Sequence, residues 1–144
     1  MKFDSSAQKK CYRQVESWLE EMFGGDVEAQ EDDPIFLLTY ESTALVVAVY
    51  PFGDDDAVIS TRAIVVKSPK LLKELLYFLL RKNDDVLFGA FGIDGDDDIF
   101  FEHTIVGNTA DKAGFEASIT SVAATADEYD DEIVERWGGQ LALE

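Results

Sequence analysis

Residues 99–139 read "IFFEHTIVGNTADKAGFEASITSVAATADEYDDEIVERWGG" and join a strand pattern to a long helical pattern. Residues 99–106 are rich in β-branched and aromatic side chains, which predicts a strand. The pattern after them predicts a helix over about 110–137, capped by Asn108 or Thr109 and ended by a pair of glycines. The stretch therefore predicts a last strand that leads into a long C-terminal helix.

The apolar side chains of this predicted helix fall along one side. A rotation of about 100° per residue places them in one sector, at spacings that alternate between three and four residues. The positions in this sector are Phe115, Ile119, Val122, Ala126, Tyr129, Ile133 and Trp137. The six carboxylates of residues 126–139 lie on the far side or the flank. Since catalytic acids need burial or a charged partner, and neither is indicated, this cluster is predicted to be the solvated face of the helix.

The rest of the chain predicts six further segments, joined by short connections. In order these are a helix at about 7–23, strands at 35–41, 44–51 and 57–66, a helix at 69–82 and a strand at 86–93. Ser5 and Gln8 have the spacing of a capping box, and residues 24–34 predict a loop. The element order is α-β-β-β-α-β-β-α. We therefore expect a single α+β domain over residues 1–144, with an antiparallel sheet packed by helices.

The second predicted helix has two apolar sides. Ser68 and Pro69 predict its start, as the cap and the first helical position. One wide apolar face is formed by Leu71, Leu72, Leu75, Leu76 and Leu79. Tyr77 and Leu80 project from roughly the opposite side, where a helix that only covers a sheet needs no apolar residues. These two residues are therefore predicted either to pack under the C-terminal helix or to contact a partner.

Composition excludes several classes of function. The chain has 12 basic and 30 acidic residues, a net charge of −18, whereas nucleic-acid binding depends on clustered lysine and arginine. The acidity favours basic partners, although a saline habitat would produce the same composition. No run approaches the roughly 20 apolar residues of a membrane span. The single cysteine, Cys11, forms no internal disulfide, and a cytoplasmic location is expected.

The sequence contains few residues suited to catalysis. His103 is the single histidine, in a strand pattern, and Cys11 falls on the apolar face of the first helix. A hydrolase that used either residue would need an activated group, such as a thiol of low pKa. No nucleophile elbow, phosphate-binding loop or dinucleotide fingerprint is present. We expect no enzyme activity, no catalytic residues and no cofactor.

Aspartate-rich turns give the alternative function. Residues 94–98, "DGDDD", match the opening of a calcium-binding loop, but Ile99 and Ile105 stand where the loop needs glycine and glutamate. Residues 54–56 form a shorter aspartate run. Both runs are typical of hairpin turns, and no metal site is expected. A small-ligand or Ca²⁺-binding protein that uses these turns remains the alternative hypothesis.

The element order and residues 99–139, with the "AD-x-Y" centre at 126–129 and the "GG" end, resemble the bacterial YbjN domain family. That family has the fold of class I type III secretion chaperones. The resemblance implies an acidic, cytoplasmic, non-enzymatic module, chaperone-like or regulatory, that binds a protein or peptide. Such chaperones are homodimers, and the helix between their third and fourth strands forms much of the dimer interface. For this chain it implies an interface at Leu76, Tyr77 and Leu80. From the charge and composition we expect neither a nucleic-acid nor a membrane partner.

Overall fold

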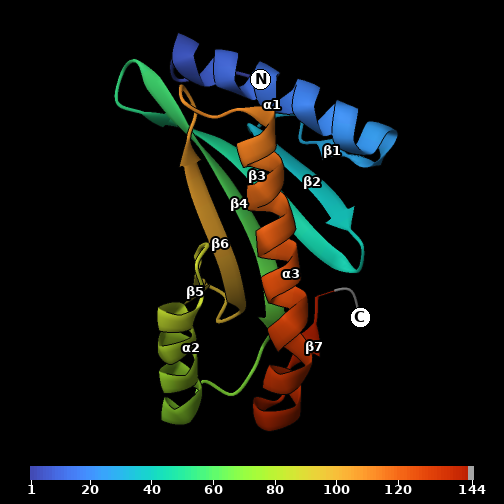
Figure 1. The fold of residues 1–144 in the computed structure, drawn as a ribbon, viewed down its shortest axis with the longest axis vertical. Helices are drawn as coiled ribbons and strands as arrows, with labels where there is room; N and C mark the ends of the chain where they lie inside the picture. Colours follow the sequence, from blue (N-terminus) through green and yellow to red (C-terminus); the bar gives the residue numbers. More distant parts are fainter. Residues whose placement is uncertain (143–144) are drawn as a thin grey trace.

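A computed structural model of the chain describes residues 1–142. Within these residues, three helices lie against one antiparallel sheet (Figure 1). The helices are α1 (Ser6–Phe23), α2 (Lys73–Asp85) and α3 (Lys112–Trp137), with a short 3-10 turn at Gly24–Asp26. The strands are β1 (Glu28–Ala29), β2 (Ile35–Tyr40), β3 (Thr43–Phe52), β4 (Asp56–Lys67), β5 (Ala90–Ile93), β6 (Ile99–Val106) and β7 (Gln140–Leu141). The predicted α+β architecture is confirmed, and no described helix has the length and apolar composition needed to cross a membrane.

The strands follow the order β1-β2-β3-β4-β6-β5, and the short β7 pairs with the end of β4. Every pairing is antiparallel. The short connections predicted this for the hairpins β2–β3, β3–β4 and β5–β6. Arg62 in β4 stands opposite Val46 in β3 on one side and opposite Glu102 in β6 on the other. Because side chains alternate between the two faces of a strand, this register also decides which residues face the helices.

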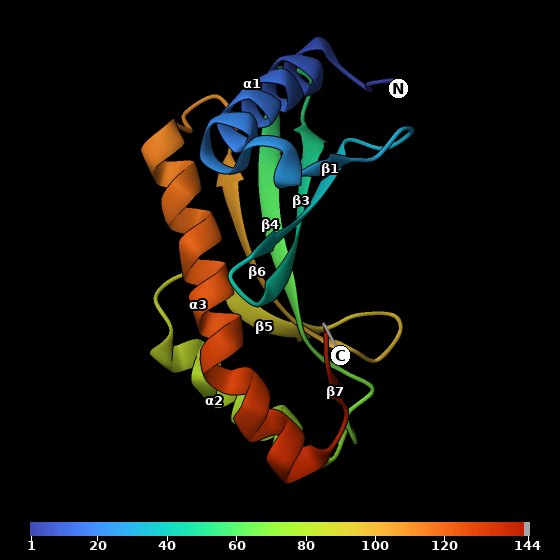
Figure 2. The same ribbon diagram turned by 90° about the vertical axis from the view of Figure 1, so that its right-hand side faces the viewer.

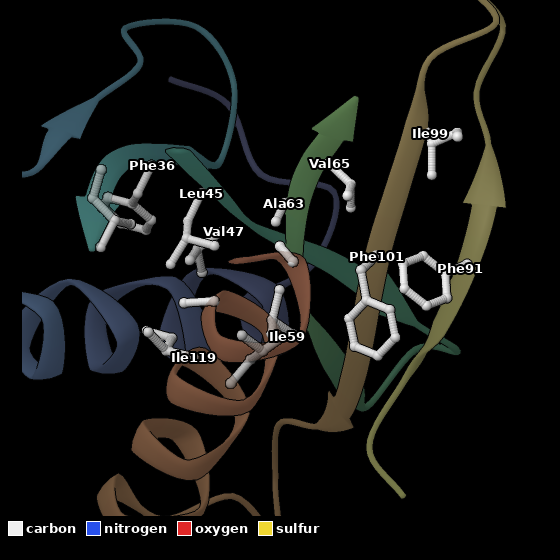
Figure 3. Close-up of a cluster of buried hydrophobic side chains, with 14 of the residues drawn as sticks. Phe36, Leu45, Val47, Ile59, Ala63, Val65, Phe91, Ile99, Phe101 and Ile119 are labelled. Carbon is white, nitrogen blue, oxygen red and sulfur yellow. The ribbon is translucent and has the colours of Figure 1, made fainter. Parts of the chain in front are cut away.

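The core lies between the sheet and helices α1 and α3 (Figure 3). Leu45, Val47 and Ile59 point from β3 and β4 toward the helices and are buried, as are Phe115 and Ile119 of α3. The predicted apolar side of α3 is confirmed, because its members are buried except for the half-buried Tyr129. The carboxylates of the opposite side are exposed, apart from one half-buried aspartate, as predicted.

Helix α1 begins close to the predicted residue. Ser5 Oγ accepts the N–H of Gln8 at 3.0 Å, which confirms half of the capping box. The other half differs, because Gln8 Oε1 accepts the N–H of Asp4 at 2.8 Å. The amide of Gln8 also donates to the carbonyl of Val49 in β3 at 2.9 Å. The buried Gln8 side chain thereby fastens the start of α1 to the sheet.

The predicted start of the second helix is wrong. Ser68 does not cap a helix but adopts a φ of 52°, and α2 begins four residues after Pro69, at Lys73. The N–H of Ser68 donates to Asp98 Oδ1 at 2.9 Å, and the N–H of Lys70 donates to the carbonyl of Trp137 at 3.0 Å. These bonds to distant elements hold the segment in a non-helical conformation, so the local preference for a helix start is overridden.

Three further boundaries differ from prediction. Asp111, rather than Asn108 or Thr109, caps α3, and its carboxylate accepts the N–H of Gly114 at 2.7 Å. Asn108 instead bonds to the β3–β4 turn through its backbone and side chain. The strand expected at 86–93 starts at Ala90, and the connector expected to be a loop contains β1. The short β1 and β7 have no sequence signal of their own and form because a longer strand lies beside them.

Candidate protein-binding surfaces

Helix α2 and the segments that flank it expose apolar side chains, which we call the α2 patch: Leu72, Leu76, Tyr77, Leu80 and Leu87. Leu76 and Leu80 are one helical turn apart, and Tyr77 lies beside them. Tyr77 is 50% exposed, Leu80 68% and Leu87 97%. Contiguous exposed apolar side chains are typical of an interaction site.

The opposite side of α2 makes the contacts with the rest of the protein. Leu75 and Leu79 are buried, and the ring of Phe78 lies 5.2 Å from that of Trp137 in α3. The possibility that Tyr77 and Leu80 pack under the C-terminal helix is therefore wrong. Phe78 takes the place next to α3, and the predicted interface residues face outward.

The segment around the α2 patch has a charge opposite to that of the chain. Residues 67–82 contain five basic side chains and one acidic side chain, a net of +4, whereas the other 128 residues contain 7 basic and 29 acidic side chains, a net of −22. The cations of Lys73 and Arg81 lie 5.6 and 5.7 Å from the centre of the Tyr77 ring. The α2 patch is therefore apolar with a basic surround.

A second exposed apolar surface is the side of the sheet that faces away from the helices, which we call the open face. Figure 2 shows α1 and α3 together on one side of β3 and β4. The apolar side chains on this side are Ile35, Leu37, Ala44, Val46, Ala48, Tyr50, Phe52, Val58, Ile64, Phe100 and Val106. Leu37, Tyr50, Phe52 and Val106 are exposed, Ala48 is buried, and the others are half-buried. Within residues 1–142, the helices pack on the other face only.

One ion pair lies in the middle of the open face. Arg62 Nε donates to Glu102 Oε2 at 2.9 Å, and its Nη2 donates to the same oxygen. Ser60 Oγ donates to Glu102 Oε1 at 2.8 Å, and the Arg62 guanidinium lies 3.7 Å from the centre of the Phe100 ring. Burial alone raises the pKa of Glu102, but the hydrogen bonds from Arg62 and Ser60 outweigh it and hold the pKa below its usual 4.5.

The geometry does not activate the two residues considered for catalysis. Burial, together with the nearby charge of Asp56, raises the pKa of the Cys11 thiol to about 11, so little thiolate forms near neutral pH. His103 Nδ1 lies 2.7 Å from Ser118 Oγ, and burial lowers the pKa of the imidazole. His103 therefore has the hydrogen-bonded structural role that its position in a strand predicts.

The aspartates of residues 94–98 form a compact turn. One carboxylate oxygen from each of Asp94, Asp96 and Asp98 lies within 4.8 Å of the others. Asp94 Oδ1 accepts the backbone N–H groups of Asp96 and Asp98 at 2.9 and 3.1 Å, which is the usual role of aspartate in a turn. The calcium hypothesis stays a prediction, and calorimetric titration with Ca²⁺ tests it.

Comparison with known proteins relates most of the chain to two groups. The family model YbjN, described as "Putative bacterial sensory transduction regulator", matches residues 12–135. A chain of the HopA1–SchA chaperone–effector complex has a TM-score of 0.66 at 6% identity, covering 84% of this chain and 94% of its own. The Yersinia pestis type III secretion chaperone SycH, solved with a stable fragment of YscM2, has a TM-score of 0.56 at 18% identity, covering 82% and 98%. No curated protein sequence matches the chain.

Proposed function

Because the chain belongs to the YbjN family and has the fold of type III secretion chaperones, we propose that it is a non-enzymatic, chaperone-like or regulatory module that binds other proteins as a homodimer. The exposed α2 patch is the observation that carries this proposal. The two similar structures contain chaperones with protein partners, which supports a protein or peptide client here. The half-buried free thiol of Cys11 fits a reducing cytoplasm.

In this proposal, Leu76, Tyr77 and Leu80 form the centre of the dimer interface. A two-fold axis brings the same surface of both copies together, so each apolar side chain is covered by the patch of the other copy. The positions of Leu76 and Leu80, one turn apart, suit the packing of one helix against another. At about 100° per residue, Arg81 and Glu74 lie beyond Tyr77 on the helix surface, away from Leu76 and Leu80. They therefore remain at the rim of the interface.

Molar mass measured by light scattering over a hundredfold range of protein concentration tests the proposed dimer. We expect the wild type to have twice the mass of the chain and Leu80→Glu to have the mass of one chain, because burying an unpaired carboxylate is costly. Leu76→Glu and Leu37→Glu form a matched pair, since these leucines are 38% and 37% exposed. Leu76→Glu should be monomeric and Leu37→Glu dimeric. A wild type that stays monomeric overturns the proposed assembly.

A further inference from the structure

A groove runs between α2 and the C-terminal end of α3, the helix beside it in Figure 1. Its volume is about 660 Å³, a size typical of pockets that bind small organic molecules. The half-buried ring of Phe78 lines the groove and connects the two helices, because it lies 5.2 Å from the ring of Trp137. The groove therefore offers an aromatic surface to a ligand, with polar side chains of both helices around it.

The α2–α3 groove differs in charge from four other grooves in residues 1–142. Its lining includes the basic side chains of Arg81, Lys82 and Arg136. The other four lie at the end of α1, at β1, between β2 and β3, and between the sheet and α3, and their linings contain acidic but no basic side chains. In a chain with a net charge of −18, an anion therefore meets favourable charges in the α2–α3 groove that these four grooves lack.

Two of the three cations border the Phe78 ring. Lys82 Nζ lies 5.4 Å from the centre of this ring, and Arg136 Cζ lies 5.2 Å from it. Lys82 Nζ is 3.9 Å from the carboxylate of Asp85, which is too long for a hydrogen bond. Arg136 donates to Glu132 at 3.1 Å from Nη1, one of several donor groups of its guanidinium. Both cations therefore retain N–H donors for a ligand beside the aromatic ring.

The acidic side chains of the groove limit which anions fit. Glu74, Asp85 and Glu132 also line it, so its three basic and three acidic side chains have a formal charge of zero. A polyanion would be repelled by these carboxylates and by the acidic chain as a whole. A single negative charge on an aromatic ring reduces this repulsion, and the ring gains apolar contact with Phe78. The groove therefore favours an aromatic monoanion.

We propose that the α2–α3 groove binds a small aromatic monoanion, such as an aryl carboxylate. The ring of the ligand packs on Phe78, and its anionic group accepts charge-assisted hydrogen bonds from Lys82 and Arg136. Tyr77 lies at the border between this groove and the α2 patch, so the ligand lies beside the proposed dimer interface. All the lining residues belong to one copy of the chain, so this site goes beyond the proposed function and does not require a dimer.

Calorimetric titration of the full chain with three naphthalene compounds tests the class of ligand. Naphthoate is the anion, naphthalenemethanol is the neutral compound with the same ring, and naphthylmethylammonium is the cation. Naphthoate should bind at least about tenfold more tightly than either of the others, because hydrogen bonds between charged groups contribute this much. No binding of naphthoate, or equally tight binding of the neutral compound or the cation, overturns the proposal.

A matched pair of arginine variants locates the site. Arg136 and Arg13 are 51% and 59% exposed, and each is paired with a glutamate on its own helix. Arg13 lies on α1, outside both the groove and the α2 patch. Arg136→Gln should weaken the binding of naphthoate about tenfold, whereas Arg13→Gln removes the same charge and should change it less than about twofold. Equal effects of the two substitutions overturn the proposed site.

Two further measurements separate a lost contact from a lost fold. Thermal unfolding shows whether each variant is folded, and Arg136→Lys, which keeps the charge, should weaken binding less than Arg136→Gln. In amide spectra of the wild type recorded by nuclear magnetic resonance, naphthoate should shift the resonances of Phe78, Lys82 and Arg136 most. Largest shifts at the open face, such as at Val46, place the ligand elsewhere and overturn the proposal.

The two proposals fail separately. If the wild type is monomeric but binds naphthoate in a manner that depends on Arg136, the proposed dimer is wrong and the ligand site stands. If the wild type is a dimer that Leu80→Glu dissociates, but naphthoate does not bind, the ligand site is wrong and the dimer stands.

Discussion

Asn83 in α2 bonds to both backbone polar groups of Phe91 in the edge strand β5. Its Oδ1 accepts the Phe91 N–H at 2.7 Å, and its amide donates to the Phe91 carbonyl at 3.3 Å. Strand β5 is the last strand in the order of the sheet, so these groups face away from β6. The side chain therefore closes an open sheet edge, which otherwise offers its backbone groups to another strand, and it fixes α2 next to β5.

Replacing Asn83 tests how much its two hydrogen bonds contribute to the free energy of unfolding. Asn83→Ala removes both bonds and should lower the free energy of unfolding by about 1–2 kcal/mol, measured in urea. Asn83→Asp keeps the acceptor for the Phe91 N–H and should lose less. An alanine variant as stable as the wild type would show that water replaces the side chain at no cost.

Thr61 is a position at which a substitution should increase stability. Among the residues that the structure describes, its buried Oγ1 has no hydrogen-bond partner, and the residue is fully buried in β4. Thr61→Val removes the unpaired hydroxyl and should raise the free energy of unfolding by about 1 kcal/mol. Thr61→Ser keeps the hydroxyl, loses a methyl group and should be less stable than the wild type. A valine variant that is less stable contradicts the assignment of an unpaired oxygen.

His103 should make stability depend on pH. Burial lowers the pKa of its imidazole in the folded state below the usual 6.5, so the unfolded chain takes up a proton first as pH falls. The contribution to stability is therefore full above about pH 6.5 and is lost as pH decreases toward the folded-state pKa. Urea unfolding of the wild type and His103→Gln between about pH 5 and pH 8 isolates this effect. The free energy of unfolding of the wild type, relative to that of the variant, should decrease as pH decreases. A difference that stays constant, or that increases as pH decreases, contradicts a contribution from His103.

Cys11 should react slowly with alkylating reagents. Its thiol is half-buried and has a pKa of about 11, so the thiolate fraction at pH 8 is far below that of an ordinary cysteine. The rate with iodoacetamide should be well below that of a cysteine peptide and should rise to the peptide's rate in denaturant. Fast alkylation of the folded protein would instead support the hypothesis of a hydrolase with an activated thiol.

Local periodicity was sufficient to predict the two sides of α3. The spacing of Ala126, Tyr129 and Ile133 places them together whatever the partner, so the covered side of α3 and the solvated carboxylates were predictable. For α2, periodicity left open whether Tyr77 and Leu80 are covered by α3, and it placed Leu72 and Leu76 on the main apolar face, although they are 51% and 38% exposed.

Features that depend on distant contacts were not predictable from the sequence. Ser68 and Pro69 form a good local helix start, but the bonds to Asp98 and Trp137 move the start of α2 to Lys73. The order of the strands likewise depends on packing across the sheet. The open face could be recognised only when the register showed which alternate residues of β3, β4 and β6 lie away from the helices.

Chemical cross-linking at single cysteines tests most directly whether a second copy covers the α2 patch. In a Cys11→Ala background, Leu76, Tyr77 and Leu80 are each replaced by cysteine and treated with a short bismaleimide, with Leu37→Cys on the open face as the control. The account predicts rapid formation of covalent dimers from the α2 positions and little from Leu37→Cys. If the α2 cysteines cross-link no faster than Leu37→Cys, the patch is not a dimer interface and the proposed homodimer is wrong.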